Sequence, residues 1–115
     1  MKLRIRGNSL RLRVSKTELA RIAESGKAED TVRFSSEESL RYAIEVRPTG
    51  AVTATFADSA ILVTLPKARL DLWLRPGEVS VEGSQPVGGG KELQILLEKD
   101  EARHGRGSDT DYSVA

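Results

Sequence analysis

The feature that most constrains the fold of this chain is a pattern of two strands, one helix and two strands that fills residues 1–47 and recurs over residues 51–99. Asn8-Ser9 and the strand from Leu10 to Val14 align with Asp58-Ser59 and the strand from Ile61 to Leu65, if one residue is inserted in the second half. A repeated supersecondary unit of this kind predicts two half-domains that share one core. Because few positions are identical, duplication and the chance similarity of two strand-rich halves both stay open.

Length and composition narrow the architecture. The chain has 115 residues, enough for one domain but not for two independent cores. Apolar residues make up 38%, below the ~45–50% of globular chains by a count that includes glycine, which indicates a thin core. We therefore predict a single α+β domain over residues 1–100, a mostly antiparallel β barrel or sandwich with two short helices and pseudo-two-fold symmetry. Residues 101–115 are polar and glycine-rich, and we expect a disordered tail there.

Two short helices are indicated by their end residues. Ser15 and Glu18 have the spacing of a capping box, and Gly26 stands where a helix would end, so we expect a helix over residues 16–25. Pro66 suits the first turn of a second helix that runs to about Trp73. Trp73 is expected to anchor this second helix in the core.

Alternating apolar residues between turn residues predict the strands. The expected strands cover residues 2–6, 10–14, 30–35, 39–47, 51–57, 60–65, 78–82 and 91–98, with a flexible loop from Ser84 to Gly90. The expected core is made of Leu3, Ile5, Leu12, Val14, Leu19, Ile22, Tyr42, Ile44, Phe56, Val63, Leu65, Leu70, Val79, Val81, Ile95 and Leu97.

The charges are dense and almost balanced, with 18 basic and 17 acidic residues. The whole molecule therefore has no strong electrostatic bias toward nucleic acid or membranes, and any polyanion binding must depend on a local asymmetry. Cysteine is absent, which fits a reducing compartment. Because no apolar run is long enough for a membrane span and the first residues alternate, we expect neither a signal peptide nor a membrane span. We expect a cytoplasmic protein with no membrane contact.

One local asymmetry stands out in the first hairpin, where Arg4, Arg6, Arg11 and Arg13 share one face. A two-residue turn at Asn8-Ser9 would place Arg6 opposite Arg11 and Arg4 opposite Arg13. Like charges in such positions repel each other, and an uncompensated set of arginines would suit phosphate recognition. The alternative is an ion-pair network in which carboxylates such as Glu45 or Glu98 lie beside the arginines.

No pattern in the sequence indicates catalysis, a cofactor or a metal. Gly88-Gly89-Gly90-Lys91 lacks the first glycine and the Ser/Thr of a phosphate loop, and a strand is expected after it. His104 is the only histidine and lies in the polar tail, which leaves little basis for a catalytic dyad or a histidine-based metal site. We therefore expect no enzymatic activity.

Several segments resemble a family of small bacterial proteins of unknown function. They are the run from Met1 to Arg13, the strand Leu40-Arg41-Tyr42-Ala43, Trp73, and Leu96-Leu97-Glu98-Lys99-Asp100. In that family the Glu-Lys-Asp is followed by an aromatic residue and a cysteine, whereas this chain has Glu101 and Ala102. The resemblance implies no activity.

Each half also resembles the swapped-hairpin AbrB-like fold of bacterial transition-state regulators and antitoxins. The segment from Val63 to Lys67, followed by Pro76-Gly77-Glu78-Val79, is similar to the strand, Pro, helix, Pro-Gly and strand of that family. The resemblance implies a barrel of interlocked hairpins and DNA binding through the first hairpin. Arg11 follows the turn as in that pattern, but the second half has Ile61 or Leu62 at the equivalent place.

These observations support a nucleic-acid-binding or regulatory module that uses Arg4, Arg6, Arg11 and Arg13. The alternative is a protein-interaction module without nucleic-acid binding or enzymatic activity, and a small enzyme is third. The expected partner is nucleic acid or another protein, and the sequence does not predict the oligomeric state.

Overall fold

The computed structural model describes residues 1–78 and 80–100. The expected tail over residues 101–115 and the expected core residue Val79 lie outside this part of the chain. The described residues form ten elements in the order β1 (Lys2–Arg6), β2 (Ser9–Val14), α1 (Lys16–Ser25), β3 (Lys27–Arg33), β4 (Ser39–Arg47), β5 (Thr53–Ala57), β6 (Ala60–Pro66), α2 (Lys67–Trp73), β7 (Ser80–Gly88) and β8 (Lys91–Lys99).

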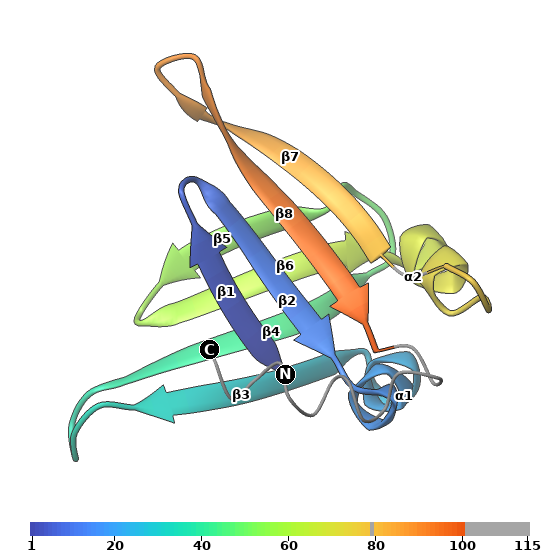
Figure 1. Ribbon diagram of the computed structural model, residues 1–115, viewed down its shortest axis with the longest axis horizontal. Coiled ribbons are helices and arrows are strands. Elements are labelled where there is room, and N and C mark those ends of the chain that lie inside the picture. Colours follow the sequence, from blue (N-terminus) through green and yellow to red (C-terminus); the bar gives the residue numbers. More distant parts are fainter. Residues whose placement is uncertain (79, 101–115) are drawn as a thin grey trace.

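The strands form two four-stranded sheets, and each sheet combines hairpins from both halves of the chain. Sheet A has the order β1-β2-β8-β7 and sheet B the order β3-β4-β6-β5. Exchanging the halves converts one order into the other. Figure 1 shows the strands of sheet A crossing those of sheet B, with both helices toward one side. The predicted α+β fold with two short helices is confirmed, and the duplication stays a prediction.

The strand pairings depart in one respect from an antiparallel sheet. All four hairpins are antiparallel, but the central pairs β2 with β8 and β4 with β6 are parallel. Parallel neighbours cannot be joined by a tight turn. These two pairs therefore come from segments far apart in the sequence, and they link the halves.

Helix α1 follows from local signals. The Ser15 hydroxyl accepts a hydrogen bond from the Glu18 amide at 3.1 Å, and the Glu18 carboxylate accepts one from the Ser15 amide at 2.8 Å. Gly26 ends the helix in the left-handed region, with φ of 83°. The predicted helix over residues 16–25, its capping box and its final glycine are confirmed.

Two strands differ from the prediction by more than two residues. β3 covers Lys27–Arg33 rather than residues 30–35. β7 continues to Gly88, so most of the segment expected to be a flexible loop from Ser84 to Gly90 is strand. The reason is its partner: β8 pairs with β7 as far as Gly88 and Lys91, which leaves only Gly89 and Gly90 between the two strands.

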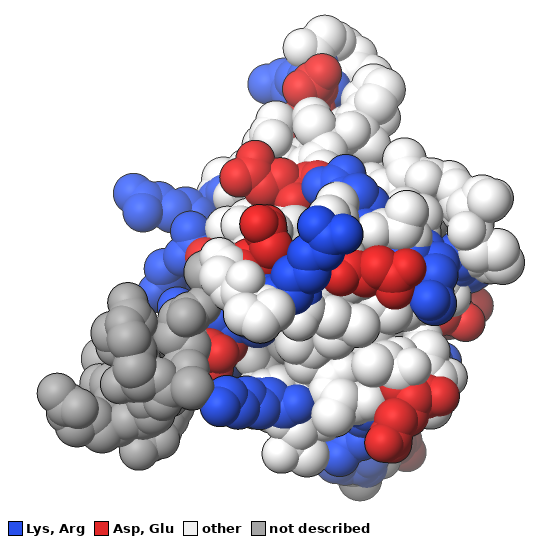
Figure 2. Space-filling model, turned by 90° about the vertical axis from the view of Figure 1, so that its right-hand side faces the viewer, with Lys and Arg blue, Asp and Glu red and all other residues white. Residues whose placement is uncertain are grey.

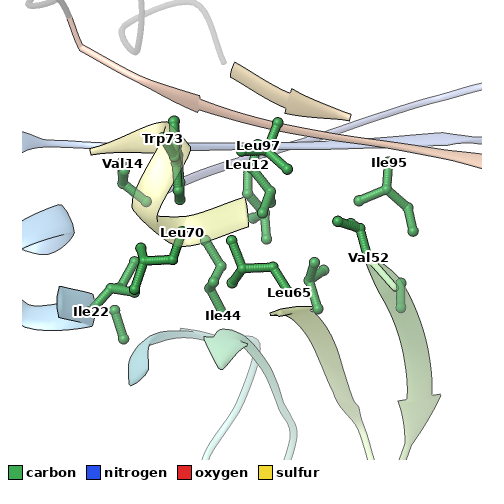
Figure 3. Close-up of a cluster of buried hydrophobic side chains, with 14 of the residues drawn as sticks. Leu12, Val14, Ile22, Ile44, Val52, Leu65, Leu70, Trp73, Ile95 and Leu97 are labelled. Carbon is green, nitrogen blue, oxygen red and sulfur yellow. The ribbon is translucent and has the colours of Figure 1, made fainter. Parts of the chain in front are cut away.

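The core lies between the sheets and draws on both halves. Figure 3 shows Leu70 and Trp73 of α2 close to Leu12 and Leu97 of sheet A and to Ile44 of sheet B. Trp73 is completely buried, as expected. The other expected core residues that are buried are Leu12, Val14, Leu19, Ile22, Tyr42, Ile44, Val63, Leu65, Leu70, Val81, Ile95 and Leu97.

Two expected core residues are instead exposed to solvent. Ile5 is 60% exposed and Phe56 is 71% exposed, and Leu3 is only partly buried. Ile5 and Phe56 lie on the edge strands β1 and β5 and point to the inner side of their sheets. The crossing of the sheets leaves these ends of the inner faces uncovered (Figure 1).

The edge strands β5 and β7 of the two sheets meet along a seam. At the seam between β5 and β7, the Gln85 side chain accepts a hydrogen bond from the Ala54 amide at 2.9 Å and donates one to the Ala54 carbonyl at 2.8 Å. Gly83 lies so close to Val52 that an added Cβ would come within 2.7 Å of the valine side chain. A side-chain amide thus substitutes for a neighbouring strand at this edge.

Near β3, within the described residues, the edge formed by β1 is held only at its start, through Met1. The Met1 amine forms an ion pair with Glu18 and lies 3.5 Å from the Asp30 carboxylate. The Tyr42 hydroxyl donates a hydrogen bond to the Met1 carbonyl at 3.3 Å. Burial raises the pKa of Glu18, but hydrogen bonds from the Met1 amine and from Ser15 outweigh burial, so the pKa lies below its ordinary value of 4.5.

Replacing Gln85 with Ala should lower the free energy of unfolding by about 1–3 kcal/mol, because it leaves two backbone groups of Ala54 without their partner. Urea unfolding would measure the loss. Gln94→Ala is the matched control. Gln94 is exposed, and within the described residues its side-chain amide makes a single, long contact of 3.3 Å with Ser84, so this variant should change stability by no more than about 0.5 kcal/mol. Equal losses for the two variants would contradict the role given to Gln85.

Glu18 should make stability depend on pH. Because its folded-state pKa is lowered, its stabilising contribution is complete above pH 4.5 and is lost as the pH falls through the folded-state pKa. The difference in unfolding free energy between the wild type and Glu18→Gln should therefore be largest near neutral pH and shrink in acid. Urea titrations at a series of pH values would measure this difference, and a difference that stays constant from neutral to acid pH would contradict the role given to Glu18.

Candidate nucleic-acid interface

The register of the first hairpin differs from the prediction. The turn is formed by Gly7 and Asn8 rather than by Asn8 and Ser9, so Arg6 pairs with Ser9. Gly7 has φ of 57°, a conformation that glycine adopts without steric cost. The expected Arg6–Arg11 and Arg4–Arg13 pairs are wrong, and Arg4 instead lies opposite Arg11.

This change of register keeps all four arginines on one face. Residue alternation assigns Arg4, Arg6, Arg11 and Arg13 to the outer face of sheet A, because Leu12 and Val14 on the other face are buried in the core. Arg13 lies opposite Lys2. We call these five residues and their two strands the basic hairpin.

The arginines of β2 lie beside carboxylates. Glu98, on the neighbouring strand β8, has a carboxylate oxygen 3.7 Å from Nε of Arg11 and 3.9 Å from Nε of Arg13. Asp100 has an oxygen 3.8 Å from Nε of Arg13. Pairs of this length between partly exposed groups contribute little stability. Glu98 thus lies beside both arginines of β2, as the ion-pair alternative expects, whereas Glu45 forms its ion pair with Arg47 in sheet B at 3.2 Å.

The arginines of β1 have a different environment. Among residues 1–78 and 80–100, Arg4 and Arg6 form no ion pair, and both side chains are exposed. Arg4 lies directly across from Arg11, so two cations share one cross-strand position. The positive charge that is available to a ligand is thus concentrated on the edge strand of sheet A.

The outer face of sheet A changes in charge from one edge to the other. Beyond β2 it presents Gln94, Leu96 and Glu98 of β8, and then Ser84 and Glu82 of β7. A shallow depression of about 220 Å³ lies between the positive and negative parts and is lined by residues that include Ser9, Arg11, Glu82 and Leu96. Figure 2, which views the molecule from its α2 side, shows basic and acidic side chains interspersed.

The equivalent hairpin of the second half carries no comparable charge. The outward positions of β5 and β6 hold Thr53, Thr55, Leu62 and Thr64. Thr53 and Thr64 share a hydrogen bond of 2.7 Å between their hydroxyls. The basic hairpin therefore has no basic counterpart on the equivalent hairpin, and binding by a symmetric pair of hairpins has no structural basis here.

One functional neighbour was missed at the sequence level. Asp100 pairs with Arg13, and its amide donates a hydrogen bond to the Val14 carbonyl at 3.0 Å. Its position next to the polar tail concealed this role. The parallel pairing of β8 with β2, which the sequence does not reveal, is what places the end of β8 beside the arginines.

Comparison with known proteins identifies a family but not an activity. Residues 1–105 match DUF7009, described as a family of unknown function. The chain belongs to this family. This match confirms the prediction, made from the sequence, that the chain belongs to a family of unknown function. Comparisons with curated proteins and with solved structures gave no match. The AbrB-like resemblance is not supported by these comparisons and stays a prediction.

Two other features are absent from the part of the chain that the structure describes. Residues 1–78 and 80–100 contain no group of three or more His, Cys, Asp or Glu side chains that could hold a metal ion. In the same residues, neither helix has the length and apolar character needed to cross a bilayer.

Because the Glu98 ion pairs are long and Arg11 is 44% exposed, replacing Glu98 with Gln in this DUF7009 chain should change the free energy of unfolding by no more than about 1 kcal/mol. Raising the salt concentration should reduce any difference from the wild type, because salt screens partly exposed pairs. Urea unfolding at low and high salt would measure both effects. A loss of several kcal/mol would show that Glu98 is a structural partner of the arginines.

Proposed function

We propose that this chain binds nucleic acid through phosphate contacts made by the basic hairpin, with Arg4 and Arg6 as the principal residues and Arg11 beside them. The observation that carries the proposal is the absence of ion-pair partners for Arg4 and Arg6 among the described residues, together with the direct opposition of Arg4 and Arg11. In this proposal the chain is a binding or regulatory module without catalytic activity.

The physical argument starts from the cost of that opposition. Two guanidinium groups at one cross-strand position repel each other, and an anion that bridges them removes the repulsion. The planar guanidinium group donates two parallel hydrogen bonds to phosphate oxygens, which a lysine ammonium does not. A phosphate backbone also repeats its charges, so it can engage Arg4 and Arg6 along the same strand.

Glu98 and Asp100 set the strength of the interaction. Their carboxylates lie near Arg11 and Arg13 and compete with phosphate for these side chains. With a net charge of only +1, the molecule has no long-range attraction to strengthen the contact. The proposal therefore describes salt-sensitive backbone binding with few phosphate contacts. Because a chain without cysteine suits a reducing compartment, the proposal places this binding in the cytoplasm.

The double variant Arg4→Ala/Arg6→Ala should weaken binding of labelled single-stranded DNA, duplex DNA or RNA. It should also flatten the plot of log affinity against log salt by about one to two units, as expected for about two lost phosphate contacts. Fluorescence anisotropy at a series of salt concentrations would measure both effects. Arg21→Ala/Arg41→Ala is the control, because it removes the same charge from exposed positions outside the basic hairpin.

Glu98→Gln gives a test in the opposite direction. Removing this carboxylate frees Arg11 and Arg13 from a competing anion, so the variant should bind nucleic acid more tightly than the wild type. Equal effects of the two double variants, or no binding by the wild type beyond weak and salt-labile association, would contradict the proposal.

A further inference from the structure

The edge of sheet A formed by β1 has backbone groups available for a further strand. In a hairpin with a two-residue turn, Arg6 and Arg4 hydrogen-bond across to β2, so the peptide groups of Leu3 and Ile5 point away from the sheet. Within residues 1–78 and 80–100, no hydrogen bond satisfies these groups of Leu3 and Ile5. Strand β1 therefore presents an open edge.

The corresponding edge of the second half is closed. There Gln85 of β7 hydrogen-bonds both backbone groups of Ala54 on β5. Ala54 lies opposite Val63, and Leu3 lies opposite Leu12, so the two positions correspond under exchange of the halves. Exchange of the halves also relates Val32 of β3 to Gln85 of β7. Because the Val32 side chain is apolar, it cannot form hydrogen bonds with β1 as Gln85 does with β5.

Apolar side chains surround the open edge. Val32 and Phe34, at the end of β3, are 39% and 68% exposed. Phe34 donates its amide to the Glu38 carbonyl at 2.8 Å, so the strand geometry continues to this residue and places it on the inner face with Val32. Figure 1 shows this end of sheet B projecting beyond β1. With Ile5, these residues form what we call the apolar margin.

The charges on the other side of β1 define what the edge can accept. A strand added to β1 alternates in step with it: side chains opposite Leu3 and Ile5 face inward, and side chains opposite Arg4 and Arg6 face outward. The inward side chains would meet the apolar margin, and the outward ones would lie beside Arg4 and Arg6, which form no ion pair in the described part of the chain.

We propose that β1 binds an extended peptide segment in which apolar residues alternate with acidic residues. The segment adds a fifth strand to sheet A, with main-chain hydrogen bonds to Leu3 and Ile5 supplying affinity. Its apolar side chains cover the margin, and its carboxylates pair with Arg4 and Arg6. Exposed apolar surface next to an open sheet edge is typical of interaction sites.

Charge argues against a second copy of this chain as the occupant. Two β1 strands side by side would place their Lys2, Arg4 and Arg6 side chains against one another on the same outer face, where like charges repel. Charged side chains on an edge strand commonly prevent such self-pairing. The same positive charges attract an acidic segment. The edge should therefore bind acidic segments in preference to a second copy of β1.

The test uses the full chain and a fluorescein-labelled peptide of alternating glutamate and valine about eight residues long, the length of an ordinary strand. Anisotropy titration should show binding at least about tenfold tighter than that of peptides with lysine for glutamate or serine for valine. Ile5→Pro removes an outward amide without removing a hydrogen bond to β2, and it should abolish this preference. Ile5→Ala, which keeps the amide, should retain most of it.

A charge swap separates pairing from a general loss of affinity. In Arg4→Glu/Arg6→Glu the preference should invert, so that the lysine-valine peptide binds more tightly than the glutamate-valine peptide. Thermal unfolding of each variant verifies that the fold is intact. Equal binding of all three peptides, an unchanged preference after Ile5→Pro, or no inversion after the charge swap would overturn the proposal.

The proposal is independent of nucleic-acid binding, although both use Arg4 and Arg6. Ile5→Pro leaves every arginine in place, so it should remove peptide binding and leave the affinity for oligonucleotides unchanged. Loss of oligonucleotide binding in Ile5→Pro, with no peptide binding by the wild type, would assign the edge to nucleic acid and overturn the peptide proposal.

Discussion

The parallel pairing of β2 with β8 and of β4 with β6 is the interaction on which the rest of this structure depends. Each pair joins a strand of the first half to a strand of the second, and each lies at the centre of its sheet. Neither half retains a four-stranded sheet without the other. The buried cluster has the same property, because Leu12 and Ile44 pack with Leu65, Trp73 and Leu97. For a chain with little apolar residue content, sharing one core between the halves makes the most of a limited number of buried side chains.

This interlocking also determines the character of the basic hairpin. The parallel register brings Glu98 next to the arginines of β2 and leaves those of β1 at the edge of the sheet. A face that the first hairpin alone would make uniformly positive becomes graded, from cationic at β1 to mixed at β7. The two proposals concern the same end of this gradient, one through the guanidinium groups and the other through the backbone and the apolar margin.

Local interactions made part of this structure predictable from sequence. The capping box of Ser15 and Glu18 and the helix end at Gly26 need no distant partner, so the sequence identifies them directly. Alternation likewise assigned the arginines to one face, because a shift of the turn by one residue changes which residues pair without changing the faces. The turn itself was misplaced since Gly7, Asn8 and Ser9 are all suitable turn residues.

Features set by distant partners were not predictable in this way. Residues 84–88 contain glycine and proline and have no strand pattern of their own, and they form a strand because β8 pairs with them. The exposure of Ile5 and Phe56 depends on how far the opposite sheet extends, which alternation within one strand does not reveal. The carboxylates beside Arg11 and Arg13 belong to β8 and to the residue that follows it, more than half the chain away.

The central position of β8 has a consequence for the order in which the protein can assemble. Strand β2 is synthesised early, but its inner neighbour in sheet A is the last strand of the described chain. Contacts between segments so distant in sequence carry a large loop-closure cost and slow the search for the native state. On the ribosome, the first hairpin must therefore wait with the inner edge of β2 unpaired until residues 91–99 have emerged, and only then can both sheets close around Trp73.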